Sequence, residues 1–423
     1  RVVLEETGET ILPWTSAICE GDHAWSSRLT LPQGGLYRIE TCLSHAGQPA
    51  VEWSIRGDMI HHVGVGDVFV IAGQSNSAGY GKDPVSDPPE IGIHLLANDM
   101  RWHLATHPFN ESTGTMHPAN REGGNPGHSP WLAFAKRVRK QTGVPVGLVQ
   151  SALGGSPLSA WNPSEDGVLF RNLLSILAEM PAEPGQRKCC GVLWYQGCSD
   201  TGEGARDTYL ARFGQFVEAL RTDLDDPSLP FMTVQIGRCT GGLDPATDRG
   251  WALVREAQRQ AAHQMANVRC VPALDLPLSD DIHISSAGNL VLGERVARAY
   301  LGLVYGSSDM GLAPDPFSAT LTREGDACSV LVRFAHVPER LLLYSLLPEQ
   351  APFRVTTAEG RELIPVAMTQ PEPDSLALLL PEDPGPDCLL HGANVRNPYP
   401  VQPTEVSTRL PVLSFCDLPI EKA

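Results

Sequence analysis

Two residues of this chain stand where a nucleophile and a general base could meet. Ser75 occurs in the run Gly-Gln-Ser-Asn-Ser-Ala-Gly, residues 73–79, directly after a continuous apolar segment. A serine at such a strand-to-helix turn is placed as a nucleophile would be, although a serine there can equally cap the next helix. The elbow motif Gly-x-Ser-x-Gly is absent, and Gly81-Lys82 lacks the remainder of a phosphate-binding loop.

The second residue is His283, in the run Asp280-Asp281-Ile282-His283. A serine nucleophile needs a base to take its proton, and the base needs a carboxylate to fix its tautomer. Asp280 precedes His283 by three residues and can orient the imidazole while both face one cleft; Asp281 is the reserve candidate. Alone this spacing is a weak signal, because surface loops often contain it. Together with Ser75 it predicts a Ser-His-Asp arrangement.

Two further loops could supply donors for an oxyanion. Residues 151–156 read Ser-Ala-Leu-Gly-Gly-Ser, and the amides of Gly154 and Gly155 can approach a ligand closely because glycine has no side chain. Residues 194–197 read Trp-Tyr-Gln-Gly, in which the Gln196 carboxamide is a candidate donor. Either loop taken alone could equally be a tight turn.

Apolar runs of the length of buried strands precede all of these loops. They are residues 67–72, 144–150, 191–195, 231–236 and 268–274. Helical spacing between them predicts helices over residues 131–140 and 205–224, and Ser285 or Ser286 could cap a helix that continues to Leu301. Alternating strands and helices predict a three-layer α/β/α domain with a parallel sheet over residues 67–305, which would gather the loops at one sheet edge.

The segments on either side of residues 67–305 have a different pattern of apolar and polar residues. At 423 residues the chain is too long for one compact core. Short alternating runs at residues 36–40 and 51–55 predict a β-rich N-terminal domain over residues 1–66. Runs at 329–334 and 340–344, among many prolines, predict a β-sandwich-like domain over residues 306–423.

Composition excludes several classes of function. With 32 basic and 49 acidic residues, the net charge of −17 argues against a nucleic-acid partner. No apolar run is long enough to span a membrane. The ten cysteines form no Cys-x-x-Cys pair and no zinc-ligand cluster with histidine, and His61-His62 is more typical of a solvated turn, so we expect no metal and no cofactor.

Taken together, the loops resemble those of the SGNH hydrolases, in the branch of the sialate O-acetylesterases and carbohydrate esterase family 6. The matching segments are residues 73–76, 146–156, 194–197, 255–258 and 280–283. The resemblance covers about residues 67–305 and implies a flavodoxin-like sheet. The β-rich flanks look like the accessory domains of sialate O-acetylesterases, which is a looser match.

The resemblance implies a role for each matching residue. Ser75 would be the nucleophile and His283 the general base. The Ser75 amide, a glycine amide at Gly154 or Gly155, and the Gln196 side chain would bind the oxyanion. Four more motif residues are candidates for substrate binding: Gln74, Asn76, Tyr195 and Arg255. Arg255 could bind a carboxylate or phosphate, or form an ion pair on a helix surface.

One position departs from the family. Where the family usually has Trp-Tyr-Gln-Gly-Glu, this chain has Cys198 in place of the glutamate. Some members are thought to use that glutamate as the acidic member of the triad, so its absence leaves the role to Asp280. We interpret Cys198 as a small packed thiol rather than a nucleophile.

The expected function is a serine esterase that removes O-acetyl groups from sialic acid or polysaccharides through an acyl-enzyme. An esterase acting on other short-chain acyl esters is an alternative, because the triad reacts with the ester while the pocket selects the alcohol. A second alternative is a carbohydrate-binding protein that kept the fold but lost catalytic activity. The only feature that favours it is Cys198 in place of the family's glutamate. The oligomeric state stays open; a leader removed before Arg1 would favour a secreted or periplasmic location.

Overall fold

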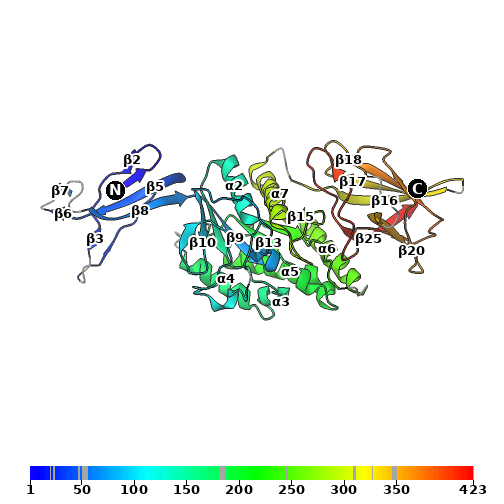
Figure 1. Cartoon of the computed structure of the whole chain (residues 1–423), viewed down its shortest axis with the longest axis horizontal. Helices are drawn as coiled ribbons and strands as arrows, with labels where there is room; N and C mark the ends of the chain where they lie inside the picture. The colour runs from blue at the N-terminus through cyan, green and yellow to red at the C-terminus, as the bar shows by residue number, and fades with distance from the viewer. Residues whose placement is uncertain are drawn as a thin grey trace.

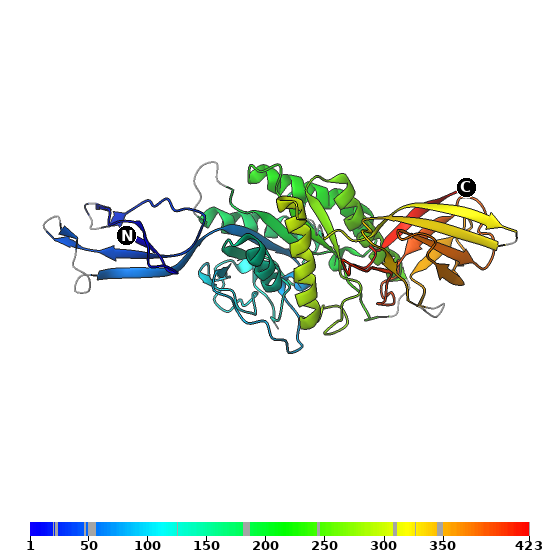
Figure 2. The ribbon, with the colours of Figure 1, turned by 90° about the horizontal axis from the view of Figure 1, so that it is seen from above.

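The protein is elongated, with an α/β region between two β-rich ends. The computed structural model describes residues 1–19, 21, 24–45, 48–49, 56–124, 126–180, 187–242, 246–307, 311–325, 327–344 and 350–422. The N-terminal strands lie at one end, the helices surround a sheet in the middle, and the C-terminal strands lie at the other end (Figure 1). The same order is seen from above (Figure 2).

The central sheet has seven strands, in the order β11-β10-β12-β9-β13-β14-β15. Six are parallel, and the edge strand β11 pairs antiparallel with β10. Their bounds are β9 Asp67–Gly73, β10 Ile93–Leu96, β11 Trp102–Leu104, β12 Val146–Gln150, β13 Gly191–Tyr195, β14 Phe231–Gln235 and β15 Val268–Pro272. Strands buried on both faces need continuous apolar runs, as the sequence has.

Helices cover both faces of this sheet. Helices α2 and α7 pack together on one face, and α3, α4 and α5 lie on the other (Figure 1). The helices are α1 Ser75–Ala78, α2 Trp131–Thr142, α3 Leu158–Trp161, α4 Val168–Glu179, α5 Ala205–Asp223, α6 Ala246–Gln264 and α7 Ser286–Tyr305, with short 3₁₀ turns η1 Pro118–Asn120 and η2 Cys198–Asp200. Ser285 caps α7, because its side chain accepts a hydrogen bond from the Gly288 amide at 3.0 Å.

The chain reverses its direction of travel across the sheet at β9, which lies between β12 and β13. Ligands bind at the carboxyl ends of the strands beside such a switch point. Gly73 ends β9 with φ of 118°, and a Cβ there would overlap the carbonyl oxygen of Tyr195. The turn into α1 therefore requires glycine, and it brings Ser75 to the switch point.

At the N-terminal end, four strands form an antiparallel sheet in the order β2-β1-β5-β8. The strands are β1 Val2–Leu4, β2 Thr10–Leu12, β5 Gly34–Cys42 and β8 Arg56–Val65, with two-stranded pairs β3 Ile18–Cys19 with β4 Trp25–Ser26, and β6 Ser44–His45 with β7 Gln48–Pro49. Strand β8 ends at Val65, two residues before β9 begins. The strand predicted over residues 51–55 lies outside the described residues.

At the C-terminal end, eight strands form one sheet in the order β20-β19-β23-β25-β16-β17-β22-β21. Phe334 on β17 and Phe353 on β19 have ring centroids 6.4 Å apart although three strands separate β17 from β19, so the sheet folds over its own core. The strands are β16 Asp315–Glu324, β17 Ala327–Ala335, β19 Phe353–Thr356, β20 Glu362–Leu363, β21 Ala367–Thr369, β22 Ser375–Leu380, β23 Leu389–Gly392 and β25 Phe415–Lys422, with a separate pair β18 Leu341–Leu342 and β24 Thr404–Glu405.

The predicted fold class is confirmed: a parallel α/β/α core carries β-rich segments at both ends. All five predicted central strands form. Strand β10 and the edge strand β11 were not predicted, nor were α4 and α6. The three-domain division at residues 66 and 305 stays a prediction. In the described part of the chain, no helix is both long and apolar enough to cross a membrane.

Candidate active site

Ser75, His283 and Asp280 lie in one line of hydrogen bonds. The Oγ of Ser75 is 2.9 Å from Nε2 of His283, and Nδ1 of the same ring is 2.7 Å from Oδ2 of Asp280. Ser75 is only 8% exposed, whereas the Asp280 side chain is 47% exposed. This order of hydroxyl, imidazole and carboxylate can move a proton from serine to histidine while the carboxylate holds the ring.

The Asp280 carboxylate is held by its own loop as well as by the ring. Its Oδ1 accepts hydrogen bonds from the amides of Ile282 at 2.9 Å and His283 at 2.8 Å. Partial burial alone would raise the pKa of Asp280, but the His283 ring and these two amides hold it below its usual value. Asp281 lies apart from the ring; its carboxylate accepts a hydrogen bond from the Thr240 hydroxyl at 3.3 Å.

Two predicted substrate-binding residues instead hold the loops together. Asn76 bridges the backbone on both sides of His283, donating to the Ile282 carbonyl at 3.2 Å and accepting from the Ile284 amide at 2.9 Å. Gln74 accepts from the amides of Gly197 at 3.0 Å and Ser199 at 3.3 Å. Both side chains are buried. They fix Ser75 and His283 relative to each other and to the end of β13.

The two candidate glycine amides are not equivalent. The Gly154 amide donates to Oε2 of Glu122 at 3.0 Å, so a carboxylate oxygen already occupies the position that an oxyanion would take. The Gly155 amide has no recorded acceptor among the described residues, and the Ser75 amide, at the first position of α1, has none there either. Gly155 has φ of 69°, and a Cβ there would meet no atom within 4 Å. These two amides are available to a ligand.

The structure does not support the prediction that Gln196 is an oxyanion donor. This side chain is fully buried, and its Nε2 donates to the Ser156 carbonyl at 3.2 Å and to Asp200 Oδ2 at 2.5 Å. Its Oε1 accepts from the Tyr209 hydroxyl at 3.0 Å. Because both amide hydrogens have acceptors, the carboxamide ties neighbouring loops together.

Tyr195 and Arg255 are also fully buried, contrary to a direct role in substrate binding. The Tyr195 hydroxyl accepts from the Gly237 amide at 3.1 Å, and burial raises its pKa. Arg255 donates to five backbone carbonyls, those of Ile236, Gly237, Ala393, Val395 and Arg396. Burial lowers the pKa of this guanidinium to about 10. Arg255 therefore joins the end of β14 to the C-terminal segment.

Cys198 packs against the central core, in agreement with its interpretation as a structural thiol. Burial raises the pKa of the Cys198 thiol to about 12, against the opposing charge of Arg255. A thiol that stays protonated at neutral pH is a poor nucleophile. The Cys198 thiol is close enough to Arg255 to feel its positive charge. No hydrogen bond between Cys198 and His283 is recorded in the described part of the chain.

Tyr80 and Glu122 are site residues that the sequence analysis missed. The Tyr80 ring lies 4.7 Å from the His283 ring between centroids, tilted by 30°. The Tyr80 hydroxyl donates to Oε1 of Glu122 at 2.6 Å. Burial and this carboxylate together raise the pKa of Tyr80. Tyr80 lies between α1 and β10, and Glu122 lies between η1 and α2, where no periodicity marks either residue.

One group of side chains has the composition of a metal site. Asp87, His107 and His128 place one ligand atom each within 4.8 Å of one another, a cluster that the sequence analysis did not predict. Lys136 already donates to Oδ1 of Asp87 at 2.5 Å. The Ser129 amide donates to Nδ1 of His107 at 3.4 Å, which leaves the ring hydrogen on Nε2, toward Asp87. A ring nitrogen that carries hydrogen has no lone pair for a metal, so the geometry fits a buried hydrogen-bond cluster better.

This cluster is expected to stabilise the fold in a pH-dependent way. Burial alone would raise the pKa of Asp87, but hydrogen bonds from His107, His128 and Lys136 lower it. A lowered pKa contributes stability that is complete above the unfolded value near pH 4 and is lost as the pH falls further. Asp87→Asn should lower the melting temperature at pH 7 by several degrees, since breaking a buried pair costs about 3 kcal/mol. In thermal melts, the difference in melting temperature between the two proteins should stay constant from pH 7 to about pH 4 and begin to narrow below that; a difference that does not narrow there would contradict this role.

Comparison with known proteins shows the family of the chain. Residues 65–302 match the family model described as carbohydrate esterase, sialic acid-specific acetylesterase. A protein of Arabidopsis thaliana named as a probable carbohydrate esterase is 32% identical over 258 residues, which are 55% of this chain and 90% of that protein. Human sialate O-acetylesterase is 22% identical over 330 residues, 65% of this chain and 57% of that protein.

A solved structure shares the fold. The crystal structure of a carbohydrate acetylesterase from Xanthomonas citri superposes with a TM-score of 0.66 at 23% identity, over 91% of this chain and 85% of that one. The family model covers more than half of the chain, and the match to the Arabidopsis protein spans most of that protein. The chain therefore belongs to the carbohydrate esterase family of sialic acid-specific acetylesterases, and it is a carboxylic ester hydrolase.

Proposed function

We propose that this protein removes O-acetyl groups from carbohydrates by a Ser-His-Asp mechanism with an acetyl-enzyme intermediate. The observation that carries the proposal is the pair of hydrogen bonds that join Ser75 to His283 and His283 to Asp280, at 2.9 and 2.7 Å. Membership of a carbohydrate esterase family supports acetylated sugars as the substrates.

In this mechanism Ser75 is the nucleophile. Its Oγ attacks the acetyl carbonyl carbon while Nε2 of His283 takes the hydroxyl proton. Collapse of the tetrahedral intermediate breaks the bond to the sugar oxygen, which leaves with the proton from His283. Water then attacks the acetyl-enzyme and gives a proton to His283; the bond to Ser75 Oγ breaks, this oxygen takes the proton back from His283, and acetate is released. Asp280 keeps the ring in the tautomer with hydrogen on Nδ1 and stabilises the imidazolium.

Charge that develops on the carbonyl oxygen needs donors already in place. We assign these to the amides of Ser75 and Gly155, because neither has an acceptor among the described residues. Gly154 is the weaker candidate, since its amide is bonded to Glu122. The positive φ at position 155 also favours glycine there.

Acetate release tests the proposal. The protein should hydrolyse p-nitrophenyl acetate and release acetate from O-acetylated sugars, whereas a binding protein without turnover would do neither. Hydrolysis of p-nitrophenyl esters with no acetate release from any acetylated sugar would favour the alternative of an esterase acting on other short-chain esters.

Removing metal ions is expected to leave this activity unchanged. Ser75, His283 and Asp280 together supply the nucleophile, the base and its orienting group, so no step calls for a Lewis acid. Acetate release should be measured after dialysis against a chelator and again after zinc is added back. A steep loss that zinc restores would contradict both the mechanism and the interpretation of the Asp87 cluster.

A further inference from the structure

The Tyr80 ring lies against one face of the His283 imidazole. The two ring centroids are 4.7 Å apart and the planes are tilted by 30°. The hydrogen bonds of His283 to Ser75 and Asp280 hold the imidazole at its two nitrogens, so they leave it able to tilt about the axis that joins those atoms. An aromatic ring packed on the face opposes this tilt. Tyr80 therefore helps to set the plane of the proposed base.

Tyr80 is itself fixed at both ends. Its backbone is held through the next residue, since Gly81 and His128 exchange hydrogen bonds at 3.0 and 2.9 Å. Its hydroxyl donates to Oε1 of Glu122 at 2.6 Å, a short bond as expected for a hydroxyl that meets a carboxylate. Burial and this carboxylate raise the pKa of Tyr80, so the hydroxyl keeps its proton and stays a donor at neutral pH. The position of the ring against His283 thus depends on Glu122.

The second oxygen of Glu122 holds the loop that carries the proposed oxyanion donor. Oε2 accepts from the Gly154 amide at 3.0 Å, and Gly154 directly precedes Gly155. A Cβ at position 154 would lie 2.7 Å from the Tyr80 hydroxyl oxygen and 2.8 Å from Oε1 of Glu122, both too close for a carbon atom. Glycine at 154 therefore makes room for the Tyr80–Glu122 pair. One carboxylate joins the side of the base to the side of the oxyanion loop.

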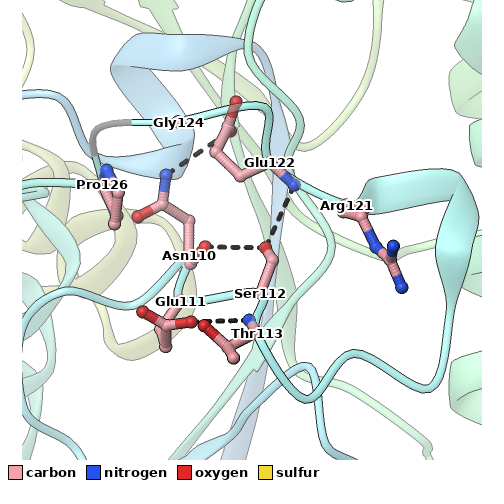
Figure 3. A pocket seen from close by; sticks show the side chains of 8 residues that line it. All are labelled: Asn110, Glu111, Ser112, Thr113, Arg121, Glu122, Gly124 and Pro126. Atoms are coloured by element: carbon pink, nitrogen blue, oxygen red, sulfur yellow. Dashed lines mark hydrogen bonds between the residues drawn. The ribbon is translucent and has the colours of Figure 1, made fainter.

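Glu122 is held in place by uncharged groups. Its amide donates to the Ser112 hydroxyl at 3.0 Å, and its Oε2 also accepts from Nδ2 of Asn110 at 3.4 Å (Figure 3). The Arg121 guanidinium points away from this carboxylate (Figure 3). Every recorded partner of the carboxylate among the described residues is a neutral donor: the Tyr80 hydroxyl, the Asn110 side chain and the backbone amides of Gly123 and Gly154. A carboxamide of the same shape could keep most of these bonds.

We propose that Glu122 is a positioning residue for catalysis, which acts through Tyr80 on the base and through Gly154 on the oxyanion loop. This role rests on the proposed function, because it matters only if His283 is the general base. Neither Glu122 nor Tyr80 has a recorded bond to Ser75 among the described residues. Loss of Glu122 therefore leaves the proposed catalytic residues present but lets the base tilt and the loop shift, and a displacement of about 1 Å costs up to about 10²-fold in rate.

Two substitutions of Glu122 test the role. Glu122→Ala should lower kcat for p-nitrophenyl acetate by about 10²-fold and leave KM within about threefold, because both donors lose their acceptor while this small substrate needs no sugar site. Glu122→Gln should recover most of the loss, since its oxygen can accept from the Gly154 amide and its amino group can donate to the Tyr80 oxygen. Organophosphate labelling of Ser75, carried to completion, counts the folded sites, so that kcat is expressed per site.

Three outcomes would overturn the proposal. They are a full kcat per labelled site in Glu122→Ala, a rise in KM at unchanged kcat, which would place Glu122 at the substrate, and a loss that Glu122→Gln does not recover, which would make the charge and not the two bonds the requirement. Turnover that survives in Ser75→Ala would instead disprove the proposed function, whatever the result with Glu122.

Tyr80→Phe keeps the ring but loses the bond to Glu122, and kcat should fall about tenfold. Tyr305→Phe is the matched control, because the Tyr305 hydroxyl donates to Oδ2 of Asp67 at 2.8 Å, at the start of β9 and so at the opposite end of that strand from Ser75. It should leave kcat within about twofold. Tyr80→Phe combined with Glu122→Ala should be no slower than Glu122→Ala alone, since the bond is already lost. Losses that multiply to about 10³-fold would contradict a shared role.

Discussion

Ser75→Ala should abolish ester hydrolysis and leave the fold intact. Loss of a triad nucleophile lowers kcat by on the order of 10⁶. The Ser75 hydroxyl has one recorded partner among the described residues, Nε2 of His283, so its removal breaks no contact that holds the loops. Asn76 and Gln74 keep their bonds to the neighbouring turns. Steady-state hydrolysis of p-nitrophenyl acetate and a thermal melt measure the two parts of this expectation.

Ser77→Ala is the matched control for Ser75→Ala. The Ser77 hydroxyl donates to the Ala72 carbonyl at 2.8 Å and has no recorded contact with His283. This substitution loses one buried hydrogen bond but should keep kcat within about tenfold of the unaltered protein. An organophosphate should label Ser75 and block turnover; near-normal turnover by folded Ser75→Ala would rule out Ser75 as the nucleophile.

The sequence alone predicted the strands and turns whose positions follow from local residue patterns. Continuous apolar runs identify β9, β12, β13, β14 and β15, since a strand buried on both faces has no polar alternation. The run of residues 280–283 placed Asp280 within reach of His283, because three residues of one turn span the distance between carboxylate and ring. Strand β10 has only four residues and the edge strand β11 has three exposed residues, so no long apolar run marks them.

Residue type alone did not show which polar side chains of the motifs are buried and which are accessible to a substrate. Gln196, Tyr195 and Arg255 occupy motif positions, yet each is fully buried and bonded to backbone or to a neighbouring side chain. Burial and hydrogen-bond partners depend on how distant loops pack. For the same reason the Glu122 bond to Gly154, across 32 positions of the chain, and the Asp87 cluster could not be foreseen.

Asp280→Asn should lower kcat by roughly 10³ to 10⁴ with little change in the loop. The asparagine oxygen can still accept from the amides of Ile282 and His283, so the turn keeps its shape. Its amide group would instead donate to Nδ1 of His283, which moves the ring hydrogen to Nε2 and removes the lone pair that must accept the Ser75 proton. The lowered pKa of Asp280 keeps the native carboxylate charged at neutral pH. The pH dependence of kcat, measured beside a thermal melt, separates a loss of the base from a loss of folded protein.

Asp281→Asn is the control that distinguishes the two carboxylates, and it should change kcat less than about tenfold. Asp281 bonds to Thr240 rather than to the imidazole, so its charge does not set the ring tautomer. Cys198 offers no substitute acid, because its thiol is packed near Arg255 and has a pKa raised to about 12. In the proposed mechanism, Asp280 therefore orients His283 alone. If Asp281→Asn proved the more damaging change, or if neither substitution lowered kcat, the acidic member of the triad would be a different residue, while the assignments of Ser75 and His283 would stand.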